Sequence, residues 1–392
     1  KDDPGAVKKD GHFEMVPVTS RITRLFLGTQ VQCAQCHDHP FYNDIKQKDF
    51  WGVNAFLRQV KRDGTPPDPA NGKMMAKPGP LTLEDDADVN VEAKVYYEKR
   101  NGVVQIAKAE FLPGDEDKRG RLVGEDGKPV QGIKRREELA DYVITHPMFP
   151  KAYVNRMWGV FFGRGFVNPV DDFNDQNKPS VPELLDELTV RFKNEFAYDP
   201  KELIRCICNS NAYNLSCVAN STNASQDKEV LFSRMVLKSM SPEQLFESLV
   251  VATKAESGES KDAKKKAKED WLDKLIGNFG DDEGNEVSFN GTIVQALMMM
   301  NGGDINDAIG RPDKGTVALA MKKHGANQRA VIRELFLATL NREPTAKEVA
   351  AVEAKFNLVR PKLEAEDKVK PERKYQDLLW ALVNSNEFLL NH

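Results

Sequence analysis

The sequence predicts a mainly α protein with one inserted β-hairpin or small sheet. Apolar residues recur at helical spacing over most of the chain. Two serines, Ser180 and Ser241, precede such runs, and Glu183 and Gln244 follow them at the spacing of a capping box. Only residues 91–111 alternate apolar and polar side chains in the manner of paired strands. The helical pattern therefore sets the fold class, and the alternating stretch is an insertion into it.

The N-terminal part of the chain divides into a lead-in and a helical region. Residues 1–18 are charged and contain glycine, which predicts a loose lead-in. A first helix is expected from Thr19 up to or just past Gly28, because apolar residues follow at helical spacing. A second helix is expected over residues 47–58. We assign residues 19–60 to one domain, in which a Cys/His-rich turn joins the two helices.

The composition of residues 61–130 predicts a loop-rich insertion. Residues 61–90 are rich in Pro, Gly and Asp, and residues 113–130 are rich in Gly, so both are expected to be loops. Between them, residues 91–111 are expected to form a hairpin. Asn101-Gly102 lies between the two alternating runs, which indicates a type I′ turn.

Residues 131–392 are expected to form one helical domain. Helices are predicted over residues 137–145, 150–163, 329–340, 346–359 and 375–384, after Ser180 and Ser241, and over the apolar run Thr292–Met300. Residues 256–269 are expected to be a solvated charged segment, because acidic residues are interleaved with their lysines.

Length and charge exclude several classes of protein. The chain has 392 residues, of which 40% are hydrophobic and 30% charged, as in a globular protein with a sizeable core. Its formal net charge of −4 shows no global bias toward nucleic acid or anionic membranes, and we expect no nucleic-acid partner. We expect no membrane span, because no apolar run approaches the length that one requires. The chain begins with Lys1 rather than Met, so we expect a processed or trimmed product.

The stretch with the richest chemistry is Cys33-Ala34-Gln35-Cys36-His37-Asp38-His39. Cys-x-x-Cys-His is the spacing at which haem c is attached. Two thiols one turn apart add to the two vinyl groups of one porphyrin, and the following histidine becomes the proximal ligand of the iron. Cys33, Cys36 and His37 are therefore candidate haem-binding residues.

Two other interpretations of this turn stay open. Cys33, Cys36, His37 and His39 together form a set of sulfur and nitrogen ligands that suits a divalent metal such as zinc. The simplest interpretation is a local disulfide or two packed thiols beside two polar histidines. A metal-dependent hydrolase, with Asp38 or Asp44 as base, is a further hypothesis for the same turn.

His37 and His39 are expected to play unequal roles. His37 directly follows Cys36, so in a haem site its ring faces the iron. His39 precedes Pro40, which favours an extended backbone at His39. In a haem site, His39 would lie next to the iron-binding residues without binding the iron itself. In a non-haem site, the rings of both His37 and His39 would bind the metal ion.

The remaining ligand candidates are scattered along the chain. A sixth iron ligand is not evident, and the candidates are His146, Met74, Met75, Met148 and His392. Cys206, Cys208 and Cys217 are expected to be packed thiols, with a Cys208–Cys217 disulfide as the alternative in an oxidising compartment.

An Arg/Asp-rich region lies further along the chain. Arg156 and Arg164 lie near Asp171 and Asp172 in sequence, which favours structural ion pairs over a substrate site. A Ca²⁺ site formed by Asp171, Asp172, Asn174 and Asp175 is the weaker alternative, because the spacing differs from that of an EF-hand.

Several longer motifs resemble a known pair of domains. Leu27-Gly28 with Cys33 to Phe41, followed by Phe50-Trp51-Gly52, resembles the planctomycete cytochrome-c-type domain. The stretches Val154 to Trp158, Phe162 to Gly165, Pro169 to Phe173, Pro182 to Asp186 and Leu378 to Phe388 are similar to the planctomycete-specific conserved domain that usually follows it. Both domains are of uncharacterised function.

The motif and the resemblance together imply a function. We expect an exported, periplasmic haem-c-type protein that serves electron transfer or redox sensing at the cell envelope, with a redox protein as its partner. From a different class, the alternative is a helical binding or scaffold module in which the Cys/His turn is a metal or disulfide staple. The sequence leaves the oligomeric state and any enzymatic activity open.

Overall fold

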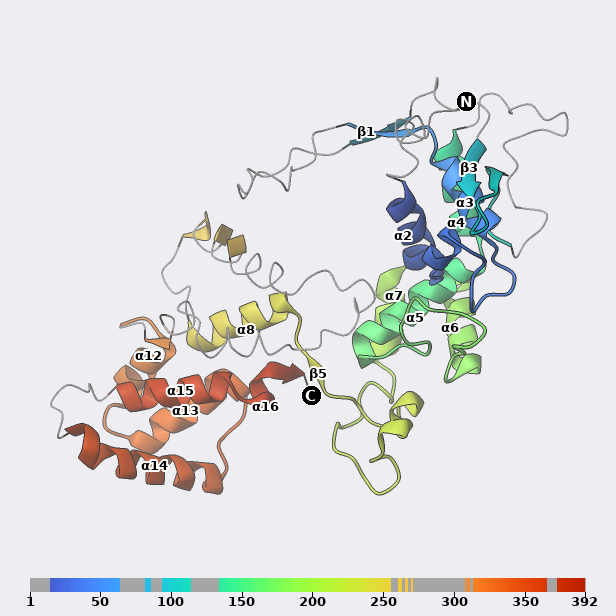
Figure 1. Ribbon diagram of the computed structural model, residues 1–392. Coiled ribbons are helices and arrows are strands. Elements are labelled where there is room, and N and C mark those ends of the chain that lie inside the picture. Colours follow the sequence, from blue (N-terminus) through green and yellow to red (C-terminus); the bar gives the residue numbers. More distant parts are fainter. Residues whose placement is uncertain are drawn as a thin grey trace. The chain divides into compact units, whose positions relative to one another are not determined.

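The computed structural model describes residues 15–63, 82–85, 94–113, 134–254, 313–364 and 372–391, and ten single positions between 260 and 310. Helices dominate the described residues, and the strands form two-stranded antiparallel ladders, which confirms the predicted fold class (Figure 1). The chain forms two compact units. Unit 1 comprises residues 1–214 and 230–232, and unit 2 comprises residues 215–229 and 233–392.

Unit 1 contains the Cys/His-rich turn and the first helices of the C-terminal region. Its elements are α2 (Val16–Leu27), η1 (Gln32–Gln35), α3 (Gln47–Phe56), β1 (Val60–Asp63), β2 (Thr82–Asp85), β3 (Lys94–Glu98), β4 (Val104–Lys108), α4 (Arg135–Thr145), α5 (Met148–Phe162), α6 (Pro182–Asn194) and α7 (Pro200–Cys208). The helices predicted over residues 47–58, 137–145 and 150–163 are confirmed as α3, α4 and α5.

Helix α2 ends where the sequence predicts, at Gly28. The backbone of Gly28 is left-handed with φ 64°, and its N–H donates to the carbonyl of Arg24 at 3.1 Å. A side chain at Gly28 would also collide with Phe173, because a Cβ atom would lie 2.8 Å from the ring. Glycine is therefore required here twice over, for its conformation and for the close approach of Phe173.

Helix α3 is the centre of the unit 1 core. Phe50, Val53 and Phe56 are fully buried, and Trp51 is nearly so. Leu27 and Val31 of the preceding segment belong to the same apolar cluster. The aromatic residues of α3 are thus core residues.

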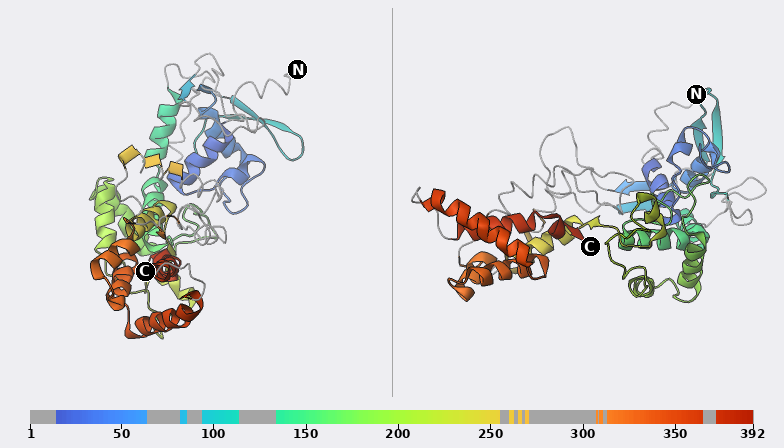
Figure 2. Two further views of the ribbon diagram at one scale, coloured as in Figure 1. Left: turned by 90° about the vertical axis from the view of Figure 1, so that its left-hand side faces the viewer. Right: turned by 90° about the horizontal axis from the view of Figure 1, so that it is seen from below.

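The predicted hairpin is present but its turn differs from the prediction. Strands β3 and β4 pair antiparallel (Figure 2), and their register places Tyr96 opposite Ile106. The carbonyl of Lys99 accepts from Gly102 at 2.8 Å, and the N–H of Lys99 donates to Val103 at 3.0 Å. Gly102 has φ 79°, but Asn101 has a negative φ, so the type I′ prediction is wrong. Because Lys99 pairs with Val103, the loop consists of the three residues 100–102 rather than two. Gly102 takes the left-handed position that such a loop requires.

The prediction that residues 61–90 form a loop throughout is also wrong at its ends. Strands β1 and β2 pair antiparallel, with Val60 opposite Asp85 and Asp63 opposite Thr82. Each strand has only four residues. Such short strands give little alternation, and their pairing depends on a contact between distant segments that a local pattern does not report.

The two predicted capping boxes have opposite outcomes. At Ser241 the box forms: the N–H of Gln244 donates to the Ser241 hydroxyl at 3.2 Å, and the Ser241 N–H donates to Gln244 Oε1 at 3.0 Å. At Ser180 it does not form, because α6 begins one residue later, with Val181 as its cap and Pro182 in the first turn. Proline is favoured at that first position, so its placement decides the start of the helix.

In its described residues, unit 2 consists mainly of helices and has one short pair of antiparallel strands, β5 and β6. Its elements are β5 (Lys238–Ser239), α8 (Pro242–Thr253), α12 (Thr316–His324), α13 (Gln328–Leu340), α14 (Ala346–Glu364), α15 (Arg373–Val383), α16 (Asn386–Leu389) and β6 (Leu390–Asn391), and η4 (Gln226–Leu231) spans parts of both units. Helices α13, α14 and α15 confirm the three helices predicted last. Leu335, Leu379 and Val383 are fully buried at the centre of its core. The helix predicted over Thr292–Met300 lies outside the described residues.

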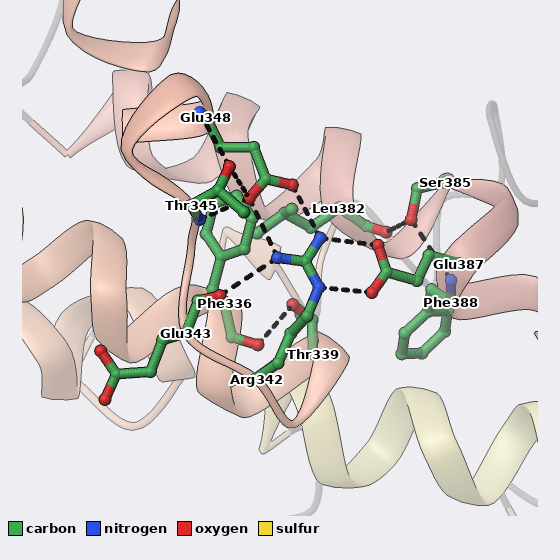
Figure 3. A network of polar contacts seen from close by, with 10 residues as sticks. All are labelled: Phe336, Thr339, Arg342, Glu343, Thr345, Glu348, Leu382, Ser385, Glu387 and Phe388. Carbon is green, nitrogen blue, oxygen red and sulfur yellow. Dashed lines mark hydrogen bonds and ion pairs between the residues drawn. The ribbon is translucent and has the colours of Figure 1, made fainter. Parts of the chain in front are cut away.

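A cluster of charged side chains ties together the end of α13, the start of α14 and α16. The guanidinium of Arg342 lies between two carboxylates (Figure 3). It donates to Glu387 at 2.5 and 2.8 Å and to Glu348 at 2.7 and 2.9 Å. Glu348 also accepts from the backbone N–H and hydroxyl of Thr345, at 2.7 and 2.8 Å. The three charged side chains remain about one-third exposed.

Candidate functional site

The Cys33–His39 turn connects α2 to α3. The two residues between its cysteines, Ala34 and Gln35, anchor it to the core. Ala34 is fully buried. The carbonyl of Gln35 accepts two hydrogen bonds from α3, from Gln47 Nε2 at 3.1 Å and from Trp51 Nε1 at 3.0 Å. The two residues between the cysteines therefore fix the turn to the core. The sequence did not predict this role of Gln47 and Trp51. It shows only that the helix after the turn carries side chains with N–H donors at these two positions.

Both cysteines of the motif are exposed thiols. Cys33 lies in η1, and the N–H of Cys36 donates to the Cys33 carbonyl at 3.4 Å. Cys206, Cys208 and Cys217 are free and half-buried, so the disulfide considered for Cys208 and Cys217 is not formed.

The ring of His37 is oriented by a backbone contact. Nδ1 lies 2.6 Å from the carbonyl oxygen of Asp38. A carbonyl oxygen only accepts, so Nδ1 is the donor of this contact and Nε2 is the nitrogen that points elsewhere. A histidine that binds a metal usually donates its other ring N–H in this way, which fixes the ring and strengthens the ligand. His37 thus has the backbone contact that often orients a ligand histidine.

His39 is buried and is used by the fold. Its Nε2 lies 2.7 Å from the carbonyl of Gln30, and its Nδ1 accepts the backbone N–H groups of Phe41 and Tyr42 at 3.1 and 3.0 Å. The ring is therefore neutral, with the proton on Nε2, and burial lowers the pKa of His39. Both ring nitrogens are engaged, so binding an ion through His39 would require breaking these contacts.

Two carboxylates, Asp38 from the turn and Asp49 from α3 itself, bind backbone groups at the start of α3. Asp38 Oδ1 accepts from the N–H of Gln47 at 3.0 Å, and Asp49 Oδ2 accepts from the N–H of Lys46 at 2.7 Å. Asp44 is exposed. Within the described residues, no three His, Cys, Asp or Glu side chains are grouped as a metal ion requires.

A second loop, residues 171–177, approaches the Cys/His turn. The N–H of Phe173 donates to the carbonyl of Gly28 at 2.9 Å, which places this loop beside the segment that leads into the turn. Burial raises the pKa of Tyr42 to about 12. Asn174 donates to the carbonyl and the carboxylate of Asp172, and Asn177 donates to the same carbonyl. These oxygens are taken up by the loop itself, which gives no support to the Ca²⁺ alternative.

Asp171 is the buried anion of this region. Its side chain, 2% exposed, lies 3.0 Å from Arg24 Nε on α2 and 3.7 Å from Arg156 on α5. The predicted structural ion pair is thus confirmed for Arg156, whereas Arg164 forms none with the described residues. Arg24 was not singled out from the sequence, because its place on α2 is far from Asp171 along the chain.

The candidates for a sixth iron ligand are not gathered at the turn. Met74, Met75 and His392 lie outside the described residues. His146 follows α4, where its Nδ1 accepts the N–H of Met148 at 3.2 Å and its ring packs against Phe111. Both His146 and Met148 are therefore held by contacts of their own.

Comparison with protein families agrees with the resemblance seen in the sequence. Residues 5–62 match the PSCyt2 family, described as a protein of unknown function (DUF1549). Residues 135–286 match the PSD1 family, described as a protein of unknown function (DUF1553). No curated protein and no solved structure matches the chain. In the part of the chain that the structure describes, no helix has the length and apolar character of a membrane span.

Proposed function

We propose, for a chain that carries a PSCyt2 domain followed by a PSD1 domain, that the Cys33–His37 turn attaches haem c and serves electron transfer or redox sensing. One observation carries this proposal. The carbonyl of Gln35 is bound by α3 and Ala34 is buried, while both thiols are exposed and the Nδ1 of His37 contacts the Asp38 carbonyl, which leaves Nε2 as the ring nitrogen for a ligand. Attachment needs accessible thiols and a histidine nitrogen that can bind the iron, and this donor set fits both needs.

Each residue of the turn has a separate task in this proposal. Cys33 and Cys36 provide the two thioether sulfurs, and His37 provides the proximal nitrogen. The Asp38 carbonyl, which accepts from Nδ1 at 2.6 Å, orients the ring and makes Nε2 a stronger ligand. Haem, when bound, supplies reversible one-electron chemistry at its iron.

His39 keeps the turn in shape instead of binding the iron. Its ring joins the Gln30 carbonyl on one side of the turn to the N–H groups of Phe41 and Tyr42 on the other. This arrangement agrees with unequal roles for the two histidines. Because thioether attachment takes place outside the cytoplasm, we further propose that the protein is exported and that its partner is a redox protein.

The test is to produce the full chain in the periplasm of a host that has a haem c attachment system. We expect a Soret band that persists after acid–acetone extraction, and a mass increase of one haem. Cys33→Ala/Cys36→Ala should abolish covalent attachment, and His37→Ala should lose the proximal-ligand spectrum. His324→Ala, at a half-buried histidine of unit 2 that pairs with Glu334, should match the wild type.

His39→Ala separates haem from a small metal ion. Under the haem proposal this variant keeps its covalent haem, because His39 is not a ligand. A colourless wild-type protein that holds one zinc ion, lost in both His37→Ala and His39→Ala, would support the metal-staple alternative. A colourless, metal-free wild-type protein would contradict both.

A further inference from the structure

We propose that the outer face of the β3–β4 hairpin docks on the surface of an anionic lipid bilayer. We define this outer face as Lys94, Tyr96 and Glu98 of β3 with Val104, Ile106 and Lys108 of β4. The hairpin turn, residues 99–103, continues it. The inference does not depend on haem attachment.

The opposite face of the hairpin fixes its orientation on unit 1. Val95, Tyr97 and Ala107 are buried, and the ring of Tyr97 stacks on Trp51 of α3 with centroids 6.2 Å apart. The carbonyl of Glu98 accepts from Gln47 Nε2 at 2.9 Å. Since successive side chains of a strand alternate between faces, the outer face must point away from α3.

The centre of the outer face is apolar and exposed. Tyr96 is 48% exposed and lies opposite Ile106, which is 53% exposed. Val104 and Val103, next to them at the turn, are 61% and 46% exposed. These four apolar side chains come from one hairpin, whose ribbon projects outward in Figure 2. Exposed large apolar side chains that occur close together favour an interaction site.

The rim of the outer face is positively charged. Residues 94–108 contain four basic residues and one acidic residue, although the whole chain has a net charge of −4. Lys94 and Lys108 lie directly opposite each other at one end of the face. Lys99 and Arg100 lie exposed in the turn at the other end. An anionic surface would attract the basic residues at both ends of the face.

The form of the patch favours a bilayer over a protein partner. A standard protein interface uses about 20 to 30 residues on each side, whereas the apolar part of this face consists of four side chains on two strands. Tyrosine with aliphatic neighbours and a basic rim is the composition of interfacial membrane anchors. The apolar centre would enter the headgroup region while the lysines contact lipid phosphates.

The test is co-sedimentation of the full chain with vesicles of equimolar phosphatidylcholine and phosphatidylglycerol. We expect binding that weakens with added salt and is lost on vesicles of phosphatidylcholine alone. Lys99→Glu/Arg100→Glu should weaken binding by at least about tenfold, since each cation near an anionic membrane contributes about fivefold. Tyr96→Ser/Ile106→Ser should also weaken it.

Matched controls distinguish the hairpin from the rest of the surface. Lys193→Glu/Lys201→Glu reverses two exposed charges of α6 and α7, and Val218→Ser replaces a valine that is 75% exposed. Both controls should bind vesicles as the wild type does. The proposal is overturned if the wild type does not bind, or if the controls weaken binding as much as the hairpin variants.

Discussion

The two units hold an arginine against carboxylates in opposite surroundings. In unit 1, Arg24 and Asp171 are 8% and 2% exposed and lie 3.0 Å apart. In unit 2, Arg342 makes four bonds to Glu348 and Glu387, but all three side chains are about one-third exposed. Because water screens charges at the surface, the larger number of bonds need not give the larger stabilisation. We therefore expect the buried Arg24–Asp171 pair to contribute more to the free energy of unfolding than the partly exposed Arg342 cluster does.

The largest expected effect is that of Asp171→Ala. The substitution leaves Arg24 and Arg156 without this carboxylate in a buried site, and such losses cost about 3 to 5 kcal/mol. The free energy of unfolding, measured by urea denaturation, checks this. Lys151, which pairs with the 61% exposed Asp186, provides the control: Asp186→Ala should cost less than about 1 kcal/mol. Equal costs in the two variants would contradict the role given to burial.

A second test concerns the packing beside Asp171. Gly28→Ala places a methyl group in a left-handed residue and 2.8 Å from the ring of Phe173, so we expect a loss of about 2 to 3 kcal/mol. Gly102→Ala also has a positive φ, but its Cβ would meet no atom nearer than 4.0 Å. It should cost only the backbone strain, about 1 kcal/mol. If the two variants unfold at the same urea concentration, Phe173 does not press on Gly28 as the structure indicates.

His39 tests the buried part of the Cys/His turn through pH. Burial lowers its pKa below 6.5, so the unfolded chain binds more protons than the folded one between the two pKa values. Its contribution is therefore complete above pH 6.5 and is lost as the pH falls through 6.5 toward the folded pKa.

The corresponding variant removes both the contribution and its pH dependence. His39→Ala should cost about 2 kcal/mol at pH 7.5, because three backbone groups lose their partner. The stability of the variant should then fall less steeply than that of the wild type between pH 6.5 and pH 5. A slope that is unchanged in the variant would assign the pH dependence to another group.

The smallest expected effect is in unit 2. Arg342 and the Thr345 N–H lower the pKa of Glu348 from 4.5 to about 2. The stabilisation is present above pH 4.5 and is lost as the pH falls from 4.5 through about 2. Because the cluster is partly exposed, Arg342→Ala should cost only about 1 kcal/mol at pH 7, and less in high salt. A cost equal to that of Asp171→Ala would overturn the comparison.

Most helices could be predicted from the sequence, because the apolar spacing and the capping residues that specify a helix lie within a few residues of one another. Ser241 caps α8 as expected, whereas Ser180 fails because the neighbouring Pro182 fixes the start of α6. The pairing of β1 with β2 could not be predicted, since it joins segments that are separated along the chain. The same reason hides Arg24 as the partner of Asp171.

The Cys/His turn was recognisable from its residue types, but not from its supports. Spacing alone identified Cys33, Cys36 and His37 as a set. The engagement of both His39 nitrogens and the clamp on the Gln35 carbonyl depend on tertiary contacts. A sequence pattern names the side chains that can react, whereas the backbone groups that hold them appear only in three dimensions.

The contact between Gly28 and Phe173 has a consequence for how this chain can vary between generations. Gly28 belongs to the segment that matches one family, and Phe173 to the segment that matches the other. The N–H of Phe173 donates to the carbonyl of Gly28 at 2.9 Å, and the ring leaves no room for a Cβ. A substitution on either side changes what the other side must accept. We therefore expect that exchanging one of the two segments alone would destabilise unit 1 unless substitutions at these two positions compensate each other.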